Sequence, residues 1–263
     1  MSSWKRRALS ALVSSCLFAG GSAWSASSSQ EAPATAAHGK TVVLVHGFFA
    51  DAGCWNAVIR LLQSAGVHVV AVENPLSSLE GDAEATRRVI DAQAGPVVLV
   101  GHSWGGAVIT QAGANPKVSS LVYVAAFAPD QGMSVDNLIA SLPPAPWLAA
   151  LKQDDAGNLS LTESGYLTYF APDVPVREAR MLSAEQGATF AGTLDQPVSQ
   201  VAWRSKPSWY VLAENDQMIA PELQRSMSAR MNAHVVPVRS SHVVMISHPE
   251  VVTAVILEAA LRR

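Results

Sequence analysis

The sequence is poor in cysteine and in charge, and the body of the chain lacks a long apolar run. Two cysteines among 263 residues exclude a disulfide-rich scaffold, so stability has to come from a hydrophobic core. Charged residues make up 15% and the formal net charge is −3, with no basic stretch after the first seven residues. This distribution argues against a nucleic-acid-binding surface. After the N-terminus, no apolar segment reaches the roughly 18–20 residues that span a bilayer.

The N-terminus has the three-part layout of a secretory signal peptide. Basic residues at 5–7 precede a moderately apolar run at 8–21, and small residues surround positions 23–26. We therefore expect a cleaved signal peptide over 1–25, with export to the periplasm or the medium. Two alternatives stay open: an uncleaved N-terminal segment, and lipoprotein cleavage before Cys16, for which the preceding apolar run is short.

Cleavage near residue 25 would also leave Cys54 without a partner for an intrachain disulfide. Residues 26–39 are rich in Ser, Ala and Pro and indicate a flexible leader. The remaining residues, 40–263, belong to a chain that is 49% hydrophobic, and they are numerous enough to form one large core. One folded domain is expected there.

Short aliphatic runs alternate with amphipathic segments along most of this domain. Nearly continuous aliphatic runs are typical of parallel strands that are buried on both faces. The expected strands cover 41–46, 67–72, 97–100, 121–126, 208–213 and 234–238. The expected helices cover 54–64, 82–94 (with Asp82 as the cap), 106–114, 221–231 and 249–261. The pattern predicts an α/β fold with a mostly parallel, doubly wound sheet.

The alternation breaks between about residues 130 and 206. This segment contains the proline-rich run 143–147, further prolines, and apolar residues in short, irregular groups. It is too long for an ordinary loop, so we interpret it as a mainly helical cap inserted over the carboxyl edge of the sheet. The alternative is an irregular surface excursion.

The most informative motif is Gly-His-Ser-Trp-Gly-Gly at 101–106, which directly follows an aliphatic strand and opens a helix. A Gly-x-Ser-x-Gly sequence in that context holds a serine on a sharp, strained turn above the sheet. The glycines are expected because side chains there would collide with the packed strand and helix. The motif predicts Ser103 as a nucleophile.

A serine hydroxyl needs a base to take its proton and an acid to orient that base. His242 follows the last strand and precedes the closing helix, where such a base belongs. Asp216 follows the preceding strand and is the expected acid. Two rivals stay open: Asp130, after the strand that follows the motif, and Glu214, at the same turn as Asp216. For each carboxylate the alternative is a solvated turn residue or helix cap.

An oxyanion hole requires two backbone N–H groups aimed at the developing negative charge. Trp104, directly after the serine, is expected to supply one, and Phe48 in the loop after the first strand is expected to supply the other. The side chains of Phe48, Phe49 and Trp104 are then expected to form the wall of an apolar pocket, with Trp147 from the cap as a further pocket residue. The alternative is that these aromatic residues belong to the core.

Six segments carry a resemblance to a known superfamily: VLVHGFFADAGCW, NPLSSL, VVLVGHSWGGAVIT, LVYVAAFAPDQGMS, LAENDQMIAPELQ and SSHVVMISHP. The chain resembles the α/β-hydrolases, and within them the small esterases of the plant methylesterase/hydroxynitrile lyase group and their bacterial relatives. The resemblance covers nearly everything from residue 41 to 261 and is weakest in the cap. It implies an α/β-hydrolase fold and the triad Ser103, Asp216 and His242, in the chain order of that fold.

Two departures from the family bear on the reaction. Cyanohydrin lyases of the group carry a glutamate before the nucleophile and a lysine after the histidine, where this chain has His102 and Val243. The resemblance therefore implies cleavage of a small-molecule carboxylic ester, with no cofactor or metal. The alternatives are an acyl-transfer or perhydrolytic enzyme, a cofactor-free lyase with the same triad, and a ligand-binding protein on a hydrolase fold.

Overall fold

The computed structural model describes residues 39–140 and 142–262. The predicted signal peptide and nearly all of the predicted leader lie outside the described residues. Within these ranges, no helix is both long and apolar enough to cross a membrane.

The body of the fold is a six-stranded sheet in which every neighbouring pair is parallel. The strand order is β2-β1-β3-β4-β8-β9. Its strands are β1 (Thr41–Val45), β2 (His68–Val72), β3 (Val97–His102), β4 (Val118–Val124), β8 (Ser208–Ala213) and β9 (His234–Val238). All residues of β1, β3 and β8 are buried, which explains their continuous aliphatic sequences. The predicted parallel sheet is confirmed.

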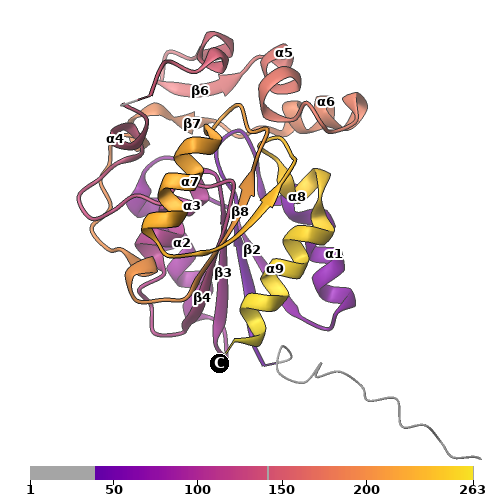
Figure 1. The fold of residues 1–263 in the computed structure, drawn as a ribbon. Helices are drawn as coiled ribbons and strands as arrows, with labels where there is room; N and C mark the ends of the chain where they lie inside the picture. Colours follow the sequence, from indigo (N-terminus) through magenta and orange to yellow (C-terminus); the bar gives the residue numbers. More distant parts are fainter. Residues whose placement is uncertain (1–38, 141, 263) are drawn as a thin grey trace, which may run out of the picture. The chain divides into compact units, whose positions relative to one another are not determined.

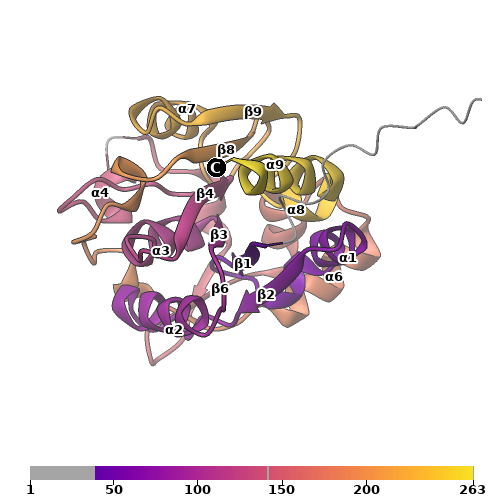
Figure 2. The ribbon, with the colours of Figure 1, turned by 90° about the horizontal axis from the view of Figure 1, so that it is seen from below.

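Helices cover both faces of this sheet (Figure 2). On one face, α1 (Asn56–Ser64) packs against α9 (Pro249–Leu261). On the other, α2 (Leu79–Asp91) packs against α3 (Trp104–Ala112), and α7 (Pro221–Arg230) lies against β8. A short helix, α8 (Val244–Ser247), precedes α9. The predicted doubly wound arrangement is therefore present.

The start of α2 corrects one detail of the sequence interpretation. Ser78 caps this helix, because its Oγ accepts a hydrogen bond from the Gly81 backbone N–H at 3.0 Å. Asp82, expected as the cap, instead lies inside the first turns of the helix and is fully buried. A capping side chain bonds to the first N–H groups of its own helix, whereas the Asp82 carboxylate contacts other parts of the chain.

The segment between β4 and β8 forms the cap, which lies at the top of Figure 1. Its helical elements are short: α4 (Val135–Ile139), η3 (Pro146–Ala150), α5 (Glu163–Gly165), η4 (Tyr166–Phe170, a π-helix), α6 (Val176–Glu185), η5 (Ala191–Thr193) and η6 (Ala202–Arg204). A small antiparallel sheet, not expected from the sequence, joins β5 (Leu151–Gln153), β6 (Asn158–Leu161) and β7 (Thr189–Phe190). These strands are too short to produce a readable alternation of apolar and polar residues.

Candidate active site

Ser103 sits between β3 and α3 on a sharply bent backbone. Its φ of 53° and ψ of −120° are rare for any residue other than glycine, and the surrounding fold has to hold them. The turn is tightly packed: a Cβ on Gly101 would lie 2.4 Å from the carbonyl oxygen of Gly105. The Ser103 carbonyl accepts hydrogen bonds from the N–H groups of Gly106 and Phe127, each at 3.0 Å. This is the strand–turn–helix arrangement that exposes a nucleophile.

His242 follows β9 and lies at the same edge of the sheet. Its Nδ1 is 2.8 Å from Asp216 Oδ2, and the two side chains are buried. Because a carboxylate can only accept, Nδ1 carries the proton and Nε2 is left as the accepting nitrogen. Ser103 and His242 both line one cavity, so the three predicted residues are brought to one place.

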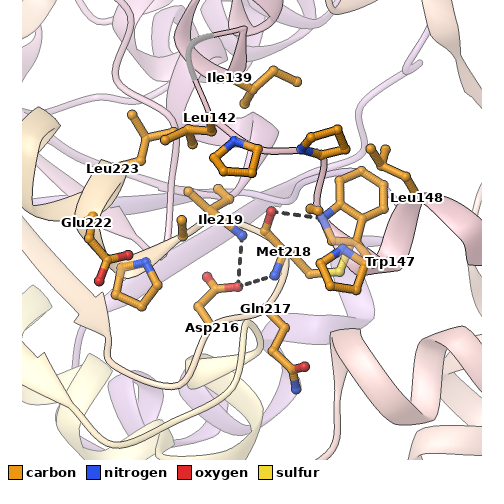
Figure 3. A pocket seen from close by; sticks show the side chains of 16 residues that line it. Ile139, Leu142, Trp147, Leu148, Asp216, Gln217, Met218, Ile219, Glu222 and Leu223 are labelled. Atoms are coloured by element: carbon orange, nitrogen blue, oxygen red, sulfur yellow. Dashed lines mark hydrogen bonds between the residues drawn. The ribbon is translucent and has the colours of Figure 1, made fainter.

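Both carboxylate oxygens of Asp216 accept hydrogen bonds that hold the side chain in place. Oδ1 accepts from the backbone N–H groups of Met218 at 2.8 Å and Ile219 at 3.0 Å, as Figure 3 shows. Oδ2 accepts from Gln224 Nε2 at 2.8 Å in addition to His242. Three donors, two from the loop after β8 and one from α7, therefore fix the direction in which this carboxylate faces the histidine.

The two rival carboxylates are engaged elsewhere. Asp130 Oδ1 is 2.6 Å from Arg204 Nη2, within the cap. Glu214 lies 4.0 Å from Arg239 at the protein surface. Of the three candidates, only Asp216 contacts the ring of His242.

His102 packs directly behind His242. Its Nε2 lies 3.0 Å from the main-chain carbonyl of His242, and the two ring centroids are 4.7 Å apart. Because the carbonyl accepts, the proton of His102 is on Nε2. Complete burial, with a contribution from the nearby His242, lowers the pKa of His102 well below its usual value. His102 is therefore a neutral support of the histidine loop at physiological pH.

The loop after β1 approaches the nucleophile closely. A Cβ on Gly47 would lie 2.6 Å from Ser103 Cβ, so only glycine permits this approach. The next residue, Phe48, stacks on Trp104 with ring centroids 4.8 Å apart and an interplanar angle of 25°. Phe49 adopts a φ of 59°, which is unusual for an aromatic residue. The two residues expected to donate backbone N–H groups are thus in direct side-chain contact.

The Trp104 side chain corrects a second expectation. It does not line the cavity at Ser103, where a wall position was expected. Its indole Nε1 instead donates a 2.8 Å hydrogen bond to Asp82 Oδ2. Burial raises the pKa of the Asp82 carboxyl, and the hydrogen bonds donated by Trp104 and the Leu76 backbone N–H oppose that rise. Nothing in the local sequence pattern around residue 82 indicates this contact.

The cavity at Ser103 has a volume of about 200 Å³ and a mostly apolar lining. The body contributes Phe48 and Phe49, and the cap contributes Trp147 and Phe170. Phe49 and Trp147, the residues expected to form the pocket, both line it. The cap therefore covers the space above Ser103.

Phe170 and Asp173 are site residues that the sequence did not reveal. Phe170, at the end of the π-helix, contacts His242 with ring centroids 5.1 Å apart at 65°. Asp173 accepts hydrogen bonds from the Ser241 backbone N–H at 2.7 Å and the Ser241 hydroxyl at 2.5 Å. Both residues tie the cap to the loop that carries the histidine.

An apolar groove of about 510 Å³ lies beside the catalytic cavity (Figure 3). The proline-rich segment of the cap and the loop after Asp216 form its two sides. Trp147 lies between groove and cavity and lines both, and its Nε1 donates a 3.1 Å hydrogen bond to the Met218 carbonyl. The indole is the largest of the five side chains that line both spaces and together form a partition between them.

Among residues 39–140 and 142–262, no group of three or more His, Cys, Asp or Glu side chains is placed to hold a metal ion. Cys54, one of the two cysteines, is a buried free thiol. The chemistry available at this site from the described residues is that of a hydroxyl, an imidazole and a carboxylate.

The chain is similar in sequence to known hydrolases. The model of the alpha/beta hydrolase family matches residues 42–255. Methylesterase 1 of Arabidopsis thaliana is 28% identical over 222 residues, which cover 70% of this chain and 81% of that protein.

Solved structures show the same fold. A pyrethroid hydrolase from Sphingobium faniae JZ-2 has a TM-score of 0.73 at 22% identity, covering 84% of this chain and 97% of its own. Polyneuridine aldehyde esterase has a TM-score of 0.74 at 21% identity, covering 83% of this chain and 98% of its own.

Proposed function

Because the chain belongs to the alpha/beta hydrolase family, we propose that it is a serine hydrolase that cleaves carboxylic esters through an acyl-enzyme intermediate. The observation that carries the proposal is the convergence of three side chains. Ser103 occupies a strained turn, His242 lines the same cavity, and Asp216 accepts from the histidine. The similarity to a plant methylesterase supports the ester as the bond that is cleaved.

The proposed reaction has two stages. In the first, His242 Nε2 accepts the proton of Ser103 Oγ as the oxygen attacks the ester carbonyl, and the protonated ring then gives that proton to the leaving alcohol. In the second, His242 takes a proton from water as the water attacks the acyl carbon, and the ring then returns that proton to Ser103 Oγ as the bond to the acyl group breaks and the acid leaves. Asp216 stabilises the imidazolium in both stages and keeps the ring in the correct tautomer.

The negative charge on the carbonyl oxygen requires hydrogen-bond donors. The backbone N–H groups of Phe48 and Trp104 are the proposed donors, because both residues adjoin the nucleophile turn. Each donor in such a hole is worth roughly 3–4 kcal/mol of transition-state stabilisation.

Hydrolysis is favoured over cyanohydrin cleavage by the side chains next to the triad. Val243 is fully buried and apolar, and His102 is held neutral by burial. Neither side chain supplies a positive charge that would stabilise a departing cyanide ion. The cavity of about 200 Å³ and its apolar lining support a small, uncharged ester as substrate.

The test uses Ser103→Ala in the purified protein. We expect turnover of p-nitrophenyl acetate to fall by about 10⁴-fold or more, because the nucleophile is removed while the fold is retained. A fluorophosphonate probe should label the wild type and not the variant. Wild-type rates in the variant would refute the serine mechanism, and an unlabelled wild type would favour a ligand-binding role.

We further propose that the protein is exported through the N-terminal segment 1–25. The support is the arrangement of basic, apolar and small residues in that segment. N-terminal sequencing of protein recovered from the periplasm or medium should find a mature chain that begins near residue 24 or 26. An intact Met1 on protein retained in the cytoplasm would contradict this proposal.

A further inference from the structure

We propose that Asp82 is a positioning residue for the oxyanion hole, acting through the indole of Trp104. The inference rests on the proposed function, because it assigns a task to a side chain that supports the reacting atoms without touching them. Four observations carry it: two hydrogen bonds, one aromatic stack, and the burial of a carboxylate.

The Asp82 carboxylate joins its own helix to the turn just before that helix and to the start of α3. It projects from α2 and is fully buried. Oδ2 accepts from the indole Nε1 of Trp104 at 2.8 Å, and Oδ1 accepts from the backbone N–H of Leu76 at 2.8 Å. Leu76 has a φ of 53°, so the second hydrogen bond also holds a strained turn. Each carboxylate oxygen therefore fixes a different neighbour.

The indole that Asp82 holds is stacked on the other proposed donor residue. The Trp104 and Phe48 rings lie 4.8 Å apart at 25°, and both side chains are buried. Trp104 is also the first residue of α3, so a displacement of its indole is transmitted through Cα to the backbone that carries the proposed donor. Displacement of the indole would therefore disturb both proposed oxyanion donors, and the hydrogen bond to Asp82 opposes that displacement.

Packing alone would not require a carboxylate at this position. Among the described residues, no Lys or Arg forms an ion pair with Asp82. A buried carboxylate without a cationic partner is less favourable than a well-packed apolar side chain. What the carboxylate adds is direction, because its two oxygens accept from two donors at defined angles.

The experiment compares Asp82→Leu with a matched control, Glu258→Leu, in the full-length protein. Glu258 Oε1 accepts from the indole of Trp209 at 3.0 Å, which is the same kind of hydrogen bond in a region remote from the cavity. The measurements are kcat and KM for p-nitrophenyl acetate and the rate at which a fluorophosphonate phosphonylates Ser103. The rates are divided by the concentration of folded protein, which is determined from the near-UV circular dichroism.

For Asp82→Leu we expect kcat and the phosphonylation rate to fall about ten-fold or more, with KM within about two-fold of the wild type. Both reactions develop negative charge on an oxygen in the hole, whereas ground-state binding does not. Glu258→Leu should change neither rate. A wild-type kcat in Asp82→Leu, a loss confined to KM, or an equal loss in Glu258→Leu would overturn the inference.

Trp104→Phe is the second variant, in case Asp82→Leu does not fold. It keeps an aromatic ring beside Phe48 and removes only the indole donor, so kcat should fall as in Asp82→Leu. In the double variant the two losses should not multiply, because both remove the same hydrogen bond. Unchanged kcat in Trp104→Phe would overturn the inference. Failure of the wild type to react with either reagent would instead refute the proposed function.

Discussion

The sheet and the cap of this protein are held together by different interactions. In the sheet, β1, β3 and β8 are wholly buried and their backbones are paired along continuous parallel ladders. The cap strands have two to four residues each. Side-chain hydrogen bonds complete the cap, such as the one that the Leu161 backbone N–H donates to Gln186 Oε1 at 2.8 Å. A ladder of backbone hydrogen bonds holds every residue of a strand in register. An isolated hydrogen bond holds only the two residues that it joins.

The sheet and the cap contribute different parts of the candidate site. Ser103, His242 and Asp216 all follow strands of the parallel sheet, so the proposed reacting groups sit on the more rigid region. The cap supplies apolar side chains that set the size of the cavity, including Trp147 and Phe170. The exception is Asp173, a cap residue whose hydrogen bonds hold the loop of His242. Substitutions in each of the two regions test this division.

Asp216→Asn removes the acid from the rigid region. We expect kcat to fall by about 10³–10⁴-fold, because the amide can donate to His242 Nδ1 and so favours the wrong tautomer of the ring. KM for a small ester should stay near the wild-type value. Steady-state kinetics measures both constants. Asp130→Asn is the control, and a comparable loss there would mean that the acid comes from the cap side.

Asp173→Asn tests whether this cap residue holds the loop of His242 in place. Burial acts to raise the pKa of Asp173, but hydrogen bonds from Ser241 and Ser240 outweigh it and hold the pKa below its usual value. The carboxylate is therefore ionised at neutral pH, and its stabilising contribution is lost only as the pH falls through that lowered pKa. We expect kcat to fall about ten-fold at neutral pH, because the histidine loop loosens.

The matched control for that variant is Asp154→Asn. Asp154 also accepts several hydrogen bonds, but all of them lie within the turn that joins β5 and β6. Its replacement should leave kcat unchanged. Equal activity in the two variants would show that the cap does not position the histidine.

His102→Gln tests the rigid region at lower pH. The folded protein holds His102 neutral while the unfolded chain binds a proton below about pH 6.5, so the free energy of unfolding should decrease as the pH falls. This residue contributes up to about 1.4 kcal/mol per pH unit. Glutamine retains an N–H donor for the His242 carbonyl, but its side chain does not bind a proton in this pH range. Urea unfolding between pH 7 and 5 should give a flatter profile for the variant, and parallel profiles would contradict the assignment.

Trp147→Ala should produce the smallest effect. The substitution removes the largest side chain of the partition between the cavity and the neighbouring groove, so longer acyl chains gain apolar contact. One additional buried methylene contributes about 0.8 kcal/mol, which corresponds to about four-fold in the ratio of kcat/KM for pentanoate over butanoate. A panel of p-nitrophenyl esters measures that ratio. Leu261→Ala, far along α9, is the control, and an unchanged ratio in Trp147→Ala would contradict the partition.

The sequence was most informative where local pattern and burial coincide. Aliphatic runs predicted the strands of the sheet because both faces of each strand are covered. The positions of Ser103, Asp216 and His242 could be predicted because parallel strands end at one edge, so residues that follow different strands meet there.

Contacts between distant segments were not predictable in this way. Asp82 meets Trp104 through its side chain, and no periodicity records such a contact. The acidic side chain near a helix start instead suggested a cap, which Ser78 provides. The π-helix that ends at Phe170 and the short strands of the cap lack a distinct period over enough residues to be recognised.

The order of the sheet has a consequence for how the protein acquires activity. β3 and β4, which flank Ser103, precede the cap in the sequence, while β8 and β9 follow it. Ser103 is therefore synthesised well before Asp216 and His242, and the strands that carry these two residues must dock across a long chain separation. Docking of that kind is slow in folding. We expect a lag in which newly made chains contain a formed β3–α3 turn yet cannot hydrolyse esters.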